Sequence, residues 1–132
     1  MTKLFIKDGV KINGAHFDPE MVKILNVARE TAPPTTDRAV WITSANDSKH
    51  KAGSLHYKNR AFDIRTFNII GNDTSTDASC GTRAEEATMW RQRMADQLGH
   101  DYDVLMEGDH IHAEYDPKPH PYIGESFNLR IQ

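Results

Sequence analysis

The 132-residue chain has one cysteine, Cys80, and no long apolar run. A single cysteine excludes an internal disulfide and any metal site built from several thiolates. No stretch approaches the ~20 apolar residues that cross a bilayer, so we expect no membrane partner. Charged residues interrupt the N-terminus before any apolar segment typical of a secretory signal, and we therefore expect a protein made in the cytoplasm.

Basic residues are not in excess either. Lysine and arginine together number 16 and acidic residues 19, which gives a formal net charge of -3. Because nucleic acids attract proteins mainly through a positive field, we expect no nucleic-acid partner. The hydrophobic content of 38% and the charged content of 27% are typical of a globular protein. The length fits one domain over residues 1–132.

Histidine, by contrast, is abundant, with seven in the chain. His50 and His56 lie in one short segment, and His110 and His112 lie in another. Imidazoles bind metals and transfer protons near neutral pH. This distribution therefore indicates where the chemistry should be sought.

Two segments carry the signals of helices. Asp18-Pro19 opens the first, because aspartate caps a helix and proline suits its first position, and the proline pair at 33–34 ends it. A Thr-x-x-Glu capping box opens the second at Thr82, and Gly99 is a typical C-terminal residue.

Strands are expected in four segments of β-branched, aromatic or alternating residues: 39–43, 60–65, 102–106 and 110–115. Residues 3–12 indicate a hairpin that turns at Asp8-Gly9, and residues 126–131 a final edge strand. Two helices among mostly antiparallel strands make an α+β domain. The helices would cover one face of the sheet and leave the other open to a ligand.

The sequence His110-Ile111-His112 lies in one of these strands. Residues two apart on a strand face the same way, so both imidazoles project from one surface while Ile111 faces the core. Such a pair suits a metal ligand with a catalytic neighbour. Two surface histidines alternating with a core residue would give the same pattern.

Asp63 interrupts a regular strand whose flanking apolar residues face the core. A carboxylate there is costly to bury unless another group pairs with it, and Arg65 on the same face could do so as a surface salt bridge. His56 and His112 offer a second explanation. With Asp63 they supply two nitrogens and one oxygen and leave a fourth position for water, as in a catalytic zinc site.

At this point the sequence resembles a known family through two motifs: Ser54-x-His56-x-x-x-x-Ala61-x-Asp63, and Asp109-x-x-His112. Similar motifs occur in the LAS-type zinc peptidases that cut bacterial cell-wall peptides. These are D-alanyl-D-alanine carboxypeptidases, D,D-dipeptidases and L-alanyl-D-glutamate endopeptidases, and the small phage endolysins among them are the most similar. The resemblance covers roughly residues 39 to 116 and implies a hedgehog/D,D-peptidase-like fold.

The resemblance also implies a role for each residue. His56, Asp63 and His112 match the ligands of one zinc ion (Zn²⁺). Asp109 matches the general base that activates a zinc-bound water and later protonates the leaving amine. His110 matches a position that assists the oxyanion or holds the substrate.

The position of Asp109 conflicts with ideal strand geometry. Residues three apart on a strand face opposite ways, so Asp109 should point away from His112. A bulge or turn at Gly108 would re-aim the acid. Without it, Glu107 and His110 form the other acid-x-x-His pair. The roles of general base and zinc ligand would then pass from Asp109 and His112 to these two residues.

One position departs from the family. Many relatives have an arginine at the end of the strand before the first motif, where this chain has Asn46. His50 or Lys49 would supply the positive charge from the following loop, unless both belong to a solvated loop. The departure affects the expected specificity more than the chemistry.

The expected function is therefore hydrolysis of a peptide bond in peptidoglycan stem peptides, by an endolysin-like endopeptidase or a D,D-carboxypeptidase. We expect a monomer that acts on the cell wall if it is a phage lysis enzyme. The alternative is a catalytically inactive zinc-binding module of a phage particle. A histidine-metal nuclease is disfavoured, because no basic face and no Asn/His pairs are evident.

Overall fold

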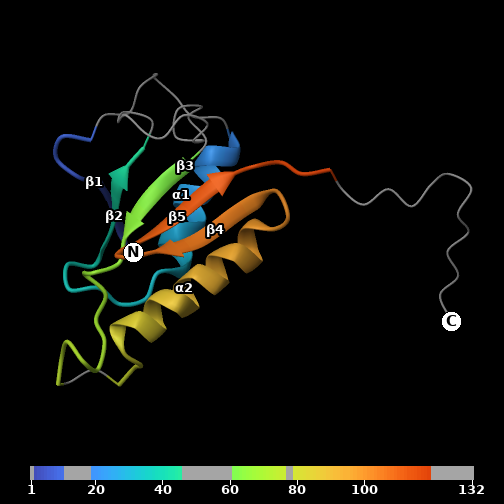
Figure 1. Ribbon diagram of the computed structural model, residues 1–132. Helices are drawn as coiled ribbons and strands as arrows, with labels where there is room; N and C mark the ends of the chain where they lie inside the picture. The colour runs from blue at the N-terminus through green and yellow to red at the C-terminus, as the bar shows by residue number, and fades with distance from the viewer. Residues whose placement is uncertain (1, 11–18, 46–60, 77–78, 120–132) are drawn as a thin grey trace, which may run out of the picture.

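The computed structural model describes residues 2–10, 19–45, 61–76 and 79–119, which form a five-stranded sheet and two helices (Figure 1). The elements in chain order are β1 (Lys3–Ile6), α1 (Pro19–Thr31), β2 (Ala39–Ser44), β3 (Ala61–Arg65), α2 (Arg83–Leu98), β4 (Tyr102–Glu107) and β5 (His110–Tyr115). The expected α+β class is confirmed. Neither helix is long and apolar enough to cross a membrane.

The strand order is β1-β2-β3-β5-β4, and all neighbours are antiparallel except β1 and β2. The second arm of the hairpin predicted at 3–12 lies partly outside the described residues, so the hairpin stays a prediction. Asp8-Gly9 does turn, with Gly9 at a φ of +86°, but within the described residues β1 pairs in parallel with β2. This register places Leu4 opposite the buried Val40, so apolar burial over a long range decides the partner. The predicted strand at 126–131 lies outside the described residues.

Helix α1 begins at Pro19 and ends at Thr31, close to the expected bounds. Met21, Ile24 and Ala28 are buried at helical spacing. The proline pair that follows at 33–34 disfavours helical backbone in the preceding residue, which explains the end of the helix.

Helix α2 has the predicted capping box. The Thr82 hydroxyl accepts a hydrogen bond from the Glu85 backbone N–H at 3.1 Å, and the Thr82 N–H donates to the Glu85 carboxylate at 2.9 Å. Two backbone donors that the helix leaves free are thereby satisfied. Gly99 ends the helix with a φ of +89°, a conformation that favours glycine.

Removal of the cap should destabilise the fold measurably. We expect Thr82→Ala to lower the free energy of unfolding by about 1 kcal/mol in a denaturant titration. Thr88→Ala is the matched control, because its hydroxyl bonds only to the Ala84 carbonyl inside the helix. An equal loss in both variants would contradict a specific role of the cap.

Both helices pack on the same face of the sheet. The Trp90 indole N–H donates to the Ala28 carbonyl at 3.2 Å and joins α2 to α1. The buried residues that the sheet contributes to this core are Val40, Ile42, Phe62, Ile64, Val104, Ile111 and Ala113. Because strand side chains alternate, Asp63, His110 and His112 face the opposite side, where neither helix packs. The candidate residues therefore lie on the face of the sheet opposite the two helices.

Candidate metal centre

Asp63 and His112 lie side by side on β3 and β5. They are direct partners in the antiparallel register, and the Asp63 Oδ1 is 2.9 Å from the His112 Nδ1. Their side chains are only 16% and 12% exposed. Two predicted metal ligands that are 49 residues apart in the sequence are thus brought into contact.

His110 and Glu107 lie in the adjacent row of the same face. They are partners across the β4–β5 hairpin, with the His110 Nε2 3.5 Å from the Glu107 Oε1. The same Nε2 is 3.8 Å from the Asp63 Oδ1. One ligand atom each from Asp63, Glu107 and His110 lie within 4.8 Å of one another, which is close enough to share a cation. Glu107 also approaches the His112 Nδ1, at 3.8 Å.

These four residues offer imidazole nitrogens and carboxylate oxygens without a thiolate. Zinc accepts both donor types in catalytic sites, where three protein ligands leave one position free. The donor set therefore fits a catalytic zinc ion better than a structural one. The sequence indicated Glu107 only as the alternative acid to Asp109. Its contact with both histidines depends on the hairpin register, which the sequence does not show.

The turn between β4 and β5 positions Asp109. Glu107 and His110 are paired, so only Gly108 and Asp109 form the loop, and Gly108 has the φ of +61° that favours glycine in such a turn. The Asp109 carbonyl accepts hydrogen bonds from the Thr66 hydroxyl at 2.7 Å and from the Thr66 N–H at 3.2 Å. The predicted turn at Gly108 is present, but it brings the Asp109 carboxylate to His110 rather than to His112.

The Asp109 carboxylate lies outside the contact between Asp63 and His112. It is 82% exposed, and its Oδ1 is 3.2 Å from the His110 Nδ1. The His110 contact holds the pKa of Asp109 below its ordinary value. His110 therefore stands between Asp109 on one side and Asp63 and Glu107 on the other.

The His112 ring lies between two carboxylates. Its Nδ1 faces Asp63, and its Nε2 is 2.8 Å from the Glu114 Oε1. The hydrogen bond with Asp63 raises the pKa of His112 to about 9, although burial opposes it, and Glu114 adds to the increase. A metal that shares Asp63 must therefore replace the proton on Nδ1. Glu114 would keep the other ring proton and fix the orientation of the imidazole.

Glu114 is a functional candidate that sequence reasoning missed. The available signal was its position two residues after His112, which places it on the same strand face. Exposed strands carry glutamates so often that this signal alone is weak. Its side chain is only 17% exposed.

Loss of Glu114 should weaken zinc binding. We expect Glu114→Ala to lower the zinc affinity by about 10- to 100-fold, as for other carboxylates behind a ligand histidine. Glu114→Gln should retain more affinity, because an amide oxygen still accepts the ring N–H. Competition with a chelating dye gives the affinities, and Glu86→Ala on α2 is the control. Equal affinity of Glu114→Ala and wild type would exclude this orienting role.

A neighbouring acidic group is less suited to a cation. Asp103, Glu114 and Asp116 also have oxygens within 4.8 Å of one another. However, the Lys118 ammonium lies 2.9 Å from Asp103 and 4.0 Å from Asp116. The Lys118 ammonium therefore already supplies a positive charge to these carboxylates, in the place of a bound cation.

Several predicted residues cannot be placed. His56, the third predicted zinc ligand, and His50 lie outside the described residues, as do Lys49 and Asn46. The salt bridge with Arg65, the alternative explanation of Asp63, is not formed, because Asp63 pairs with His112 and Arg65 stacks on aromatic rings.

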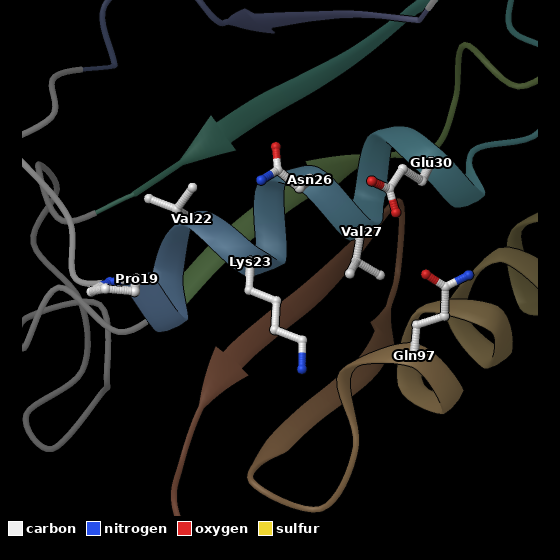
Figure 2. A pocket seen from close by; sticks show the side chains of 7 residues that line it. All are labelled: Pro19, Val22, Lys23, Asn26, Val27, Glu30 and Gln97. Carbon is white, nitrogen blue, oxygen red and sulfur yellow. The ribbon is translucent and has the colours of Figure 1, made fainter.

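A hollow of about 680 Å³ between α1 and α2 contains none of these residues (Figure 2). Figure 2 shows its lining, which comes from α1 apart from Gln97 of α2. Another hollow, of about 360 Å³, borders the hairpin turn and includes Gly108 and Asp109. Of these two hollows, only the second reaches the candidate site.

Comparisons with known proteins do not add to this geometry. No family model, no curated protein and no solved structure matches the chain. The functional assignment therefore depends on the residues and their arrangement.

Proposed function

We propose that this protein is a zinc-dependent peptidase that hydrolyses a peptide bond in the stem peptides of bacterial peptidoglycan. The contact between Asp63 and His112 is the observation that carries the proposal. Two motifs that are far apart in the sequence supply a carboxylate and an imidazole at 2.9 Å on the face of the sheet opposite the helices. His56 completes the proposed ligand set.

The ligand chemistry supports zinc as the cofactor. A bound zinc ion supplies Lewis acidity, which polarises the scissile carbonyl and lowers the pKa of a water molecule. Asp63 and His112 are held by adjacent strands, so their donor atoms need little rearrangement. Glu114 holds the far side of the His112 ring.

Asp109 is the proposed general base. It accepts a proton from the attacking water and then delivers that proton to the leaving amine. Aspartate is a carboxylate at neutral pH, as this step requires, and the His110 contact, which lowers the pKa of Asp109, makes it a weaker proton acceptor than a free aspartate. His110, in contact with Asp109, is placed to hold the substrate or to stabilise the oxyanion. Glu107 is the alternative base, because it contacts both histidine rings directly.

Digestion of purified peptidoglycan tests the activity. We expect zinc-loaded protein to release fragments with new amino groups and a chelator to abolish the release. Mass spectrometry of the fragments identifies the bond and separates an endopeptidase from a D,D-carboxypeptidase. The absence of new amino groups with zinc bound would contradict the proposed activity.

The second candidate is a zinc-binding module of a phage particle without catalytic activity. The exposure of Asp109 favours it, because the side chain is 82% exposed and touches the cluster only through His110. This candidate predicts wild-type zinc affinity without peptide release. The digestion experiment therefore separates the two functions.

A further inference from the structure

Arg65 is held in a fixed position on the same face as the metal centre. Its guanidinium carbon lies 4.8 Å from the centre of the Trp41 ring and 4.5 Å from the centre of the Phe67 ring. Trp41 in turn packs against Phe5, with ring centroids 4.9 Å apart. Contacts of an arginine with aromatic rings restrict its orientation while leaving its hydrogen-bond donors available.

The donors of Arg65 have no partner within the residues that the structure describes. Among those residues no hydrogen bond or ion pair to its guanidinium is formed, and the Nε is buried without an acceptor. The acids on this face are engaged by histidines instead, Asp63 by His112 and Glu107 by His110. Arginine presents its donors in a plane that matches both oxygens of a carboxylate.

Arg65 is adjacent to the proposed catalytic cluster. Its partner in the sheet register is His110, whose ring contacts Asp63 and Glu107. Neighbouring strands are only ~4.8 Å apart, so a short peptide on this face can reach both places. Among the described residues of this face, Arg65 presents a guanidinium beside the cluster that no carboxylate of the cluster engages.

We propose that Arg65, clamped between Trp41 and Phe67, binds a carboxylate of the peptide substrate next to the scissile bond. The inference rests on the proposed peptidase function and narrows its substrates to peptides with a free carboxylate near the cleaved bond. Arg65 provides a positive charge on the sheet, whereas the family resemblance led us to expect one from His50 or Lys49, which lie outside the described residues. The clamp fixes the guanidinium before the substrate arrives, which reduces the entropy lost on binding.

A matched pair of ligands tests the proposal. The first is the synthetic stem pentapeptide L-Ala-γ-D-Glu-L-Lys-D-Ala-D-Ala, and the second is the same peptide with its carboxylates converted to carboxamides. Calorimetry and NMR titration of the zinc-loaded protein give both affinities without requiring cleavage. We expect wild type to prefer the carboxylate peptide by roughly 10- to 100-fold. Singly amidated peptides then identify which carboxylate is bound.

Variants separate recognition from folding. Arg65→Gln should lose the preference and bind both peptides as weakly as wild type binds the amide, while its zinc affinity stays unchanged. Arg65→Lys should retain part of the preference, because it keeps the charge but not the planar donors. Lys3→Ala removes a cation from β1 of the same sheet and is the control.

The outcomes distinguish this inference from the proposed function. If wild type binds both peptides equally or binds neither, or if Arg65→Gln keeps the preference, the role of Arg65 is overturned. If wild type shows the preference and Arg65→Gln loses it, but neither peptide is cleaved, the carboxylate site stands and the peptidase proposal fails. Complete loss of the preference in Arg65→Lys, with native zinc affinity, would contradict the part of the recognition that is assigned to charge.

Discussion

Zinc binding should be lost when Asp63 is replaced by alanine. The carboxylate contacts His112 at 2.9 Å and lies 3.8 Å from the His110 ring, so its removal takes away the oxygen that faces both imidazoles. We expect the affinity of Asp63→Ala to fall by more than about 100-fold, since even the partners behind metal ligands contribute 10- to 100-fold. Peptide release should fall in parallel. Metal analysis after dialysis and calorimetry with zinc give the two measurements.

Asp103→Ala is the matched control for this loss. Asp103 is also a strand carboxylate, but its partner is Lys118 at 2.9 Å rather than a histidine. We expect it to bind zinc as wild type does. Wild-type zinc affinity in Asp63→Ala would show that the metal centre does not lie at this contact. That result would also contradict the proposed function.

Turnover should be lost without loss of zinc when Asp109 is replaced by asparagine. The substitution preserves shape but removes the proton acceptor, and we expect kcat to fall by about 10²- to 10⁴-fold. The backbone of the turn should be unaffected, because Thr66 binds the Asp109 carbonyl rather than its side chain. Zinc affinity, measured on the same preparation, should remain within a few-fold of wild type.

Glu107→Gln is the counterpart that identifies the base. If this variant loses turnover and keeps zinc while Asp109→Asn stays active, Glu107 is the base and the acid-x-x-His motif shifts to Glu107 and His110. If Glu107→Gln instead loses zinc, Glu107 is a ligand, as its place in the three-residue group with Asp63 and His110 allows. Full activity in both variants would contradict catalysis by either acid.

The helices were predictable from the sequence because their signals are local. The capping box at Thr82 and the proline at position 19 act within one helical turn, so no distant contact is needed to read them. The partner of β1 was not predictable in this way. Its pairing with β2 depends on residues more than 30 positions away, whereas the turn at Asp8-Gly9 gives information only about the residues next to it.

The candidate site was predictable to the extent that it depends on strand alternation. Alternation placed His110 and His112 on one face and Asp63 on the face of its own strand that avoids the core. It could not show the register that joins β3 to β5, nor the stacking that holds Arg65 away from Asp63. The roles of Glu107 and Glu114 were not predicted for the same reason, since the contacts of an acid on a strand depend on which residues the register places beside it.

The two-residue turn at Gly108 and Asp109 links the candidate metal centre to the packing of the core. Each residue of β4 faces either the helices or the cluster, as buried Val104 and exposed Leu105 illustrate. A one-residue slip of β4 against β5 would reverse that alternation along the whole strand, sending Glu107 toward the helices and apolar side chains into solvent. A single register, joined at this turn, therefore serves both the packing of the core and the arrangement of the cluster.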